Sequence, residues 1–273
     1  MKTNRTILHV SLPLCLLCTV WFLTVLTACS RELSCLELVQ EVVVPEIHQN
    51  LSGLTWNPET ATLFAITNEP TLVFELNTQG HVLRKIALHG FKDTEGITHL
   101  TGTLFAVIEE RRDSVCVIDI PAQATSIAYA AASCLQWETT PTSNKGFEGL
   151  SYDPGTRTIF AMREGKPFLC LAIPLDKRDT PGQPRKIMLP SLPVRDVASI
   201  IRDPDGSMWI LSEASARILH VGADAQIQKT YRLPAGRHDI QAEGIARTPD
   251  GRLFVVGEPN IFVEYVEKEH CAN

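Results

Sequence analysis

The chain has 273 residues, with 31 Asp and Glu residues against 25 Lys and Arg residues, so its formal net charge is −6. Removal of residues 1–28, which contain Lys2 and Arg5 but no acidic residue, would change this charge to −8. This balance argues against a nucleic-acid partner, since a nucleic-acid-binding protein needs a basic surface for the phosphates. The remaining ~245 residues contain no Pro/Gly/Ser-rich linker and are long enough for one large domain.

The N-terminal segment has the pattern of a bacterial lipoprotein signal. A basic start precedes an apolar run from Ile7 to Leu26, and Thr27-Ala28-Cys29 follows. Cleavage before Cys29 would leave its thiol to carry lipid. The alternative is an uncleaved membrane anchor, because the apolar run is nearly long enough to span a bilayer. Either origin places the domain outside the cytoplasm on a tether, and Ser30 after the cysteine favours the periplasmic face of the outer membrane over the inner membrane.

A short pattern recurs five times between residues 50 and 260. Each copy opens with a small residue before an aliphatic one and closes an apolar run with a glutamate about fifteen residues later. The openings are Ser52-Gly53-Leu54, Glu95-Gly96-Ile97, Glu148-Gly149-Leu150, Ala198-Ser199-Ile200 and Glu243-Gly244-Ile245. A spacing of 43 to 53 residues between openings, filled with short β-type runs, is typical of propeller blades.

The first repeat shows the expected strands of one blade. They are residues 53–56, 62–67, 71–76 and 81–88, separated by turn signals such as Asn57-Pro58. The last repeat offers only three strands, and the β-rich run 37–44 before the first repeat is left over. We therefore expect an all-β, five-bladed propeller closed by an N-terminal strand. The alternative of six blades needs a hidden repeat, in 121–145 or 176–195.

The expected domain organisation follows from these two patterns. It comprises a signal peptide (1–28), a lipidated tether (29–35), the propeller (36–268) and a C-terminal tail (269–273).

Acidic residues gather at one end of the predicted channel, because the start of the inner strand and the end of the second strand share a face. The first ring comprises the opening positions Ser52, Glu95, Glu148, Ala198 and Glu243, with Asp93 and Asp196 nearby. The second ring comprises the closing residues Glu69, Glu110, Glu164, Glu213 and Glu258. Ten crowded carboxylates are expected to bind cations or share protons, and oxygen-only ligands favour Ca²⁺ or Mg²⁺.

Two other interpretations of these residues stay open. The second-ring glutamates could instead cap the following turns, since a structural role also predicts regular recurrence. Four arginines reach the same face and could pair with the acids or meet an anionic ligand bridged by metal: Arg111, Arg112, Arg163 and Arg195.

Five cysteines remain after Cys29 and the signal peptide. Cys116 and Cys134 lie in one repeat and could form a hairpin bridge, and Cys35 and Cys271 flank the closure of the ring. Because five is odd, at least one thiol must be unpaired or intermolecular.

The segment Leu51–Pro58 with Leu63–Glu69, together with Asp93–Ile97 and Phe147–Leu150, resembles the SdiA-regulated (YjiK-like) family. The resemblance covers roughly residues 36–268. It implies an exported or membrane-tethered propeller linked to calcium, and a distant similarity to phytase-like propellers.

These observations lead to two functional hypotheses. No nucleophile elbow, P-loop or zinc motif is present, so the first is a non-enzymatic, calcium-binding envelope protein that acts as a sensor, scaffold or binding module. Its expected partners are a lipid anchor, a divalent cation, and an envelope protein or small anionic ligand. The alternative is a calcium-dependent phosphoester hydrolase, in which the metal holds phosphate and polarises water.

Overall fold

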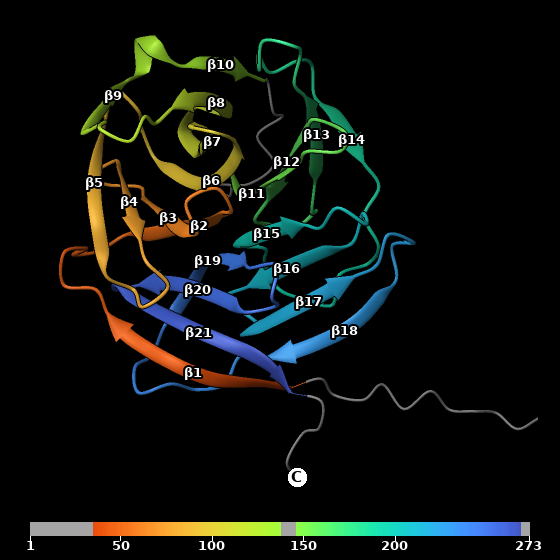
Figure 1. The fold of residues 1–273 in the computed structure, drawn as a ribbon. Coiled ribbons are helices and arrows are strands. Elements are labelled where there is room, and N and C mark those ends of the chain that lie inside the picture. The colour runs from red at the N-terminus through yellow and green to blue at the C-terminus, as the bar shows by residue number, and fades with distance from the viewer. Residues whose placement is uncertain (1–34, 138–145, 269–273) are drawn as a thin grey trace, which may run out of the picture. The chain divides into compact units, whose positions relative to one another are not determined.

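The computed structural model describes residues 35–137 and 146–268, and these residues form five sheets arranged as the blades of a ring, antiparallel except for one short parallel pairing (Figure 1). One compact unit, Leu33–Asn273, contains all five sheets. The prediction of an all-β, five-bladed propeller is therefore confirmed. None of the helices in the described part is long and apolar enough to cross a membrane.

Each blade is numbered here by its inner strand in chain order. Blade 1 comprises β2 (Leu51–Asn57), β3 (Thr62–Thr67), β4 (Leu72–Leu76), β5 (Val82–His89) and the short β9 (Ser126–Ala128). Blade 2 comprises β6 (Thr94–Thr101), β7 (Leu104–Glu109), β8 (Ser114–Asp119) and β10 (Ser133–Gln136). Blade 3 comprises β11 (Phe147–Asp153), β12 (Thr158–Arg163), β13 (Cys170–Pro174) and β14 (Arg185–Ile187).

Blade 4 comprises β15 (Ser199–Arg202), β16 (Met208–Ser212), β17 (Arg217–Val221) and β18 (Ile227–Arg232). Blade 5 comprises β19 (Gln241–Arg247), β20 (Leu253–Glu258), β21 (Ile261–Lys268) and β1 (Cys35–Val43). Two single-turn 3₁₀ helices, Glu110–Arg112 and Tyr129–Ala131, lie in the connections of blade 2.

The turns between inner and second strands are built by side chains that bond to their own backbone. Asn57 Oδ1 accepts a hydrogen bond from the backbone N of Glu59 at 3.0 Å, and Asp153 Oδ1 accepts one from Gly155 at 2.8 Å. Such Asx turns explain why Asn-Pro and Asp-Pro pairs punctuate the repeats.

The ring is closed by the N-terminal strand. β1 pairs antiparallel with β21, from Cys35 opposite Lys268 to Val43 opposite Ile261. The backbone N of Val44 continues the contact by donating to Asn260 O at 2.9 Å. The predicted closure is confirmed, and it leaves blade 5 without an unpaired third strand, which would be an aggregation hazard.

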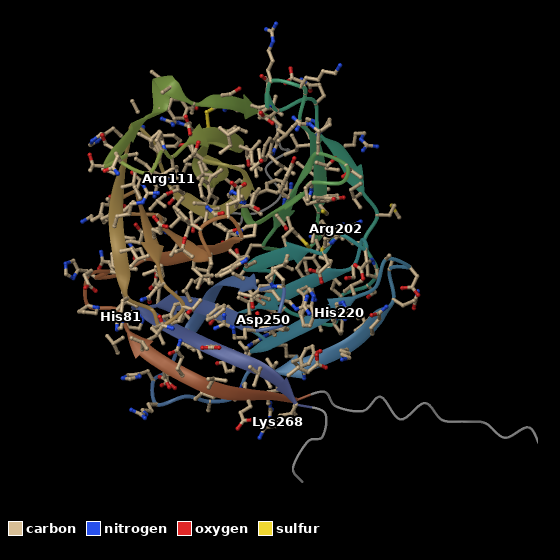
Figure 2. All side chains as sticks on the ribbon, viewed as in Figure 1. His81, Arg111, Arg202, His220, Asp250 and Lys268 are labelled. Atoms are coloured by element: carbon tan, nitrogen blue, oxygen red, sulfur yellow. A yellow bond between two sulfur atoms is a disulfide. The ribbon has the colours of Figure 1, made fainter. Side chains whose placement is uncertain are left out.

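Most of the described cysteines are in disulfides. Cys116 and Cys134 form a disulfide across β8 and β10, seen as a yellow bond in Figure 2. Cys35 is also disulfide-bonded, and its predicted partner, Cys271, lies outside the described residues. Cys170 is the buried free thiol that the odd count required.

Where the structure describes them, the two long intervals between repeats contain no sixth blade. Residues 121–136 supply β10 to blade 2, but they also send β9 back to pair in parallel with β5 of blade 1. The interval 176–195 supplies only β14 among named strands. A parallel fifth strand borrowed from the next repeat was not expected from the sequence.

Five hydrophobic clusters hold the blades together, one at each junction between neighbours. At the junction of blades 1 and 2 the rings of Phe64 and Phe105 lie 4.4 Å apart, and at that of blades 2 and 3 Trp137 meets Phe147 edge-on at 5.4 Å. Burial of apolar surface between blades is thus the main stabilising contribution to the ring.

Loss of β1 should destabilise the whole ring. We expect residues 44–273 to melt at least about 10 °C below residues 33–273, because the lost ladder bonds contribute about 0.5–1.5 kcal/mol each and β21 becomes an edge. Thermal unfolding followed by circular dichroism measures this difference. Equal midpoints and equal cooperativity would show that β1 is only a linker.

Candidate metal centre

The first-ring positions are β-bulges in the inner strands. In blade 2, Thr94 pairs with Glu109 and Gly96 pairs with Ile108, so Glu95 is the extra residue. The same irregularity occurs at Ser52, Glu148 and Glu243. A bulge re-aims a side chain away from the ordinary alternation of a strand. The side chains at these bulges are therefore directed away from the blade junctions, which the side chains of the flanking residues fill.

The glycine after three of the four bulges has a steric reason. A Cβ atom on Gly53 would lie 2.6 Å from the backbone O of Glu95 in the next blade, and one on Gly96 would overlap the backbone O of Glu148. On Gly244 it would lie 2.7 Å from the backbone N of Leu54. The Glu-Gly pairs thus combine a channel carboxylate with the close backbone approach that closes the ring.

The first-ring glutamates are half-buried and close to one another, and this shifts their pKa values. Burial, and then the negative charges of neighbouring glutamates, raise the pKa of Glu148 well above its usual value. The same causes raise the pKa of Glu243 to about 8 and that of Glu95 to about 7. The neighbouring charges belong to blades 2 to 5: Asp93, Glu110, Glu164, Glu213 and Glu258, with the first-ring glutamates acting on one another.

The tightest group of carboxylates comes from blade 2. One oxygen from each of Asp93, Glu95 and Glu110 lies within 4.8 Å of the other two. Glu110 Oε1 also accepts a hydrogen bond from the backbone N of Gly146 in the chain leading to blade 3, at 2.7 Å. Three half-buried carboxylates with no His or Cys among them match the ligands that Ca²⁺ and Mg²⁺ prefer.

Two predicted site residues lie apart from this group. Asp196 is buried, and its two oxygens accept hydrogen bonds from Ser212 Oγ and from the backbone N of Ala214. That arrangement ties the entry of blade 4 to the loop after β16. Glu69 is exposed and is not among the charges that raise the pKa values of Glu95, Glu148 and Glu243.

The second ring contains Asn68, which the sequence did not indicate. The backbone N of Asn68 donates to Asn50 O, just as that of Glu110 donates to Asp93 O and that of Glu164 to Gly146 O. Asn68 therefore occupies the blade 1 position equivalent to Glu110, and its Nδ2 donates to Glu95 Oε1 at 3.1 Å. The ring has four glutamates and one asparagine, with Glu69 one residue beyond it.

Glu109 is a second residue that sequence reasoning missed. It is fully buried, and it accepts hydrogen bonds from the backbone N of Lys92, from Arg112 Nη1 and from Ser114 Oγ at 2.7 to 3.0 Å. Glu109 and Glu110 are adjacent and serve opposite sides of the strand end. One organises the core of blade 2, and the other belongs to the acidic group.

The nearby arginines are largely committed to other partners. Arg111 Nε donates to Asp93 Oδ2 at 3.0 Å, and Arg112 pairs with Glu109 and lies 4.4 Å from the ring of Tyr129. Arg163 is buried with its guanidinium 5.5 Å from the ring of Phe147. The backbone N of Arg195 donates to Ser215 Oγ. The ion pair between Arg111 and Asp93 ties one of these arginines to the acidic group.

The model of one protein family, described as SdiA-regulated, matches residues 35–266. The chain belongs to the SdiA-regulated family. The match spans all five blades and both rings, so the family resemblance seen in the repeat motifs is confirmed.

Solved structures with a similar fold include several proteins of known description. A calcium-binding protein, regucalcin, from Agrobacterium tumefaciens has a TM-score of 0.56 and 14% identity over 88% of this chain and 97% of its own. A luciferin-regenerating enzyme has a TM-score of 0.52 and 13% identity over 85% and 95%. A gluconolactonase from Xanthomonas campestris has a TM-score of 0.50 and 12% identity over 84% and 89%. At such identities the likeness shows the fold alone.

The raised pKa values make stability depend on pH. In the folded state Glu95 and Glu243 keep their protons up to about pH 7 and pH 8, whereas in the unfolded state they lose them near pH 4.5. Their stabilising contribution is complete below about pH 4.5 and is lost as the pH rises through 7 to 8. In a metal chelator we therefore expect the melting temperature to fall between pH 5 and pH 8.

The variant Glu243→Gln, whose amide resembles the protonated acid, should show a smaller fall. The exposed Glu46→Gln serves as control and should match the parent protein. A parent melting temperature that stays constant or rises over this range would contradict the burial of these acids.

Proposed function

We propose that this member of the SdiA-regulated family is an exported propeller that binds Ca²⁺ at the acidic mouth of its channel. It serves the bacterial cell envelope as a sensor, scaffold or ligand-binding module. The observation that carries the proposal is the group formed by Asp93, Glu95 and Glu110, whose ligand oxygens lie within 4.8 Å of one another. The further glutamates of blades 3 to 5 add negative charge around it.

Electrostatics supports a cation at this position. Burial and mutual repulsion disfavour the ionised forms of Glu95, Glu148 and Glu243, and a divalent cation would offset both effects. Ca²⁺ takes six to eight oxygens in flexible geometry, so carboxylates supplemented by water suit it. Regucalcin, one of the fold neighbours, is described as a calcium-binding protein, which favours Ca²⁺ over Mg²⁺.

A binding role agrees with the side chains around the acids better than the hydrolase alternative does. Hydrolysis of a phosphoester needs cations free to hold the phosphate beside the metal. Arg111 is paired with Asp93, while Arg163 is buried against Phe147. Activity of the calcium-loaded protein towards a panel of phosphomonoesters would revive the alternative.

Calcium titration tests the proposal directly. Residues 33–273 should bind Ca²⁺ in isothermal titration calorimetry, and saturating Ca²⁺ should raise the melting temperature at pH 8. Glu95→Gln and Glu110→Gln should each weaken binding at least about tenfold, or ~1.4 kcal/mol, whereas Glu46→Gln should leave it unchanged. Absence of binding up to about 1 mM Ca²⁺ would overturn the calcium site.

We further propose attachment to the envelope, on the periplasmic face of the outer membrane, through lipid on Cys29. The support is the sequence of residues 1–29, which lie outside the described part of the structure. Expression in a Gram-negative host should place the protein in the outer-membrane fraction and label it with palmitate. Cys29→Ser should lose the palmitate label. Labelling that persists in Cys29→Ser would contradict the lipobox.

A further inference from the structure

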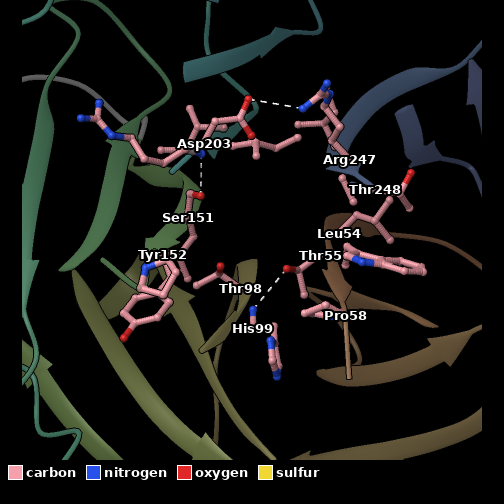
Figure 3. A pocket seen from close by; sticks show the side chains of 18 of the residues that line it. Leu54, Thr55, Pro58, Thr98, His99, Ser151, Tyr152, Asp203, Arg247 and Thr248 are labelled. Atoms are coloured by element: carbon pink, nitrogen blue, oxygen red, sulfur yellow. Dashed lines mark hydrogen bonds and ion pairs between the residues drawn. The ribbon is translucent and has the colours of Figure 1, made fainter. Parts of the chain in front are cut away.

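A second concave site lies at the other mouth of the channel. The inner strands enter at the first-ring residues and end four to six residues later, and a cavity of about 490 Å³ opens there (Figure 3). All five blades line it, and its wall includes the apolar side chains Leu54, Leu150, Ile200 and Ile245. These residues follow the bulge region along the strands, so an aliphatic layer separates the cavity from the carboxylates.

One position of the repeat, which lines this cavity in every blade, changes in chemical character around the ring. The residue three places after each first-strand glycine, or after Ser199 in blade 4, is aromatic in blades 1 to 3 and cationic in blades 4 and 5. The five residues are Trp56, His99, Tyr152, Arg202 and Arg247, and all of them line the cavity. A purely structural position in a ring of similar blades would hold similar residues, whereas this position divides the wall into an aromatic side and a cationic side.

The preceding hydroxyl residues, by contrast, have a structural role. Thr55 Oγ1 accepts a hydrogen bond from the backbone N of His99 at 3.2 Å, and Ser151 Oγ accepts one from Arg202 at 2.8 Å. Each bond joins one inner strand to the next, as the dashed lines in Figure 3 show. These ties hold His99 and Arg202 at fixed places in the wall.

The cationic side carries a positive charge without a carboxylate partner. Arg247 Nη1 lies 3.5 Å from Asp203 Oδ2, which also accepts from Trp209 Nε1 at 2.9 Å. Arg202, labelled in Figure 2, has no ion pair within 4.0 Å among the described residues, and its guanidinium lies 4.8 Å from the ring of Phe160. An arginine with unused donors on a concave wall is suited to an anion.

Two buried donors of the wall lack hydrogen-bond partners in the part of the chain that the structure describes. They are Arg202 Nε and Trp56 Nε1, which lie on opposite sides of the division. Buried polar atoms are normally satisfied, so orphaned donors call for an explanation. Both atoms are covered by protein, so a ligand in the cavity would bond to them only after these side chains shift.

We propose that this cavity binds a small organic anion, with a flat aromatic body against Trp56 and Tyr152 and a carboxylate or phosphate at Arg202 and Arg247. The volume lies within the range of small-molecule sites. The aliphatic floor and the aromatic wall accept a flat apolar body, and the two arginines supply positive charge in a chain whose net charge is −6. The site is separate from the acidic mouth and needs no metal.

Paired ligands test the proposal in the presence of a chelator, so that calcium binding has no influence on the result. Indole-3-acetate should bind residues 33–273 at least about tenfold more tightly than its neutral analogue indole-3-acetamide. Phenyl phosphate, compared with phenol, tests the phosphate form of the same chemistry, and the tighter anion identifies the preferred group. Calorimetry and ligand-observed NMR measure the affinities.

Spectroscopy locates the site, and matched variants test the arginine. In protein labelled with ¹⁵N-tryptophan, the indole N–H signal of Trp56 should shift on binding, while that of Trp137, which lies in a blade junction, should not. Arg202→Gln should weaken binding at least about tenfold, and Arg217→Gln, an exposed arginine of the same blade, should not. Trp56→Phe assigns the signal.

Three results would overturn the proposal: no binding of either anion up to about 5 mM, equal binding of the anions and their neutral analogues, or unchanged affinity in a folded Arg202→Gln variant. The thermal midpoint of each variant establishes that it is folded.

Discussion

Five inner strands pass close to a common axis, and in three blades the contact between neighbouring backbones leaves no room for a Cβ atom. Gly53, Gly96 and Gly244 satisfy this constraint. In blades 3 and 4 the approach is looser, since a Cβ on Gly149 would meet side-chain atoms of Ile200 at 3.3 Å and of Met162 at 3.4 Å, and Ser199 replaces glycine. Every other feature of the molecule depends on this close approach, because it sets the spacing at which the five hydrophobic junctions pack and the distance over which opposing carboxylates repel one another.

The same constraint connects the fold to its chemistry. The bulge before each glycine turns one side chain out of the blade junctions, so a residue chosen at that position adds charge at the mouth without disturbing the junctions. Gathering ionisable acids there costs stability as the pH rises, because their pKa values lie above the usual value. Interblade packing and the closing strand β1 offset that cost. Destabilised groups held in place by a stable frame are typical of binding sites.

The fold could be predicted from the sequence because the repeat has local signals, namely turn residues and β-type runs. In addition, the last repeat lacks one strand and the N-terminal run 37–44 is left over to supply it. The site could be read only in outline. Asn68, and not Glu69, contacts Glu95. Which residues are equivalent in two blades depends on how the strands pair across the bulge, and the spacing of residues in the sequence does not show this. Glu109 could not be told from Glu110 without knowing which side of the strand is buried. The strand β9 was missed because its partner lies in the preceding blade.

Departures from symmetry then decide what each mouth of the ring can bind. Five identical blades would place the same side chain five times around the axis, and such a symmetric arrangement does not select a particular small molecule. At the acidic mouth Ser52 and Ala198 interrupt the ring of glutamates, and the tightest group of oxygens comes from blade 2 alone. At the opposite mouth aromatic residues of blades 1 to 3 and arginines of blades 4 and 5 line one cavity. Positions that are alike in every blade hold the ring together, and the few that differ give each mouth its own chemistry, so residues that break the repeat are the ones that indicate function.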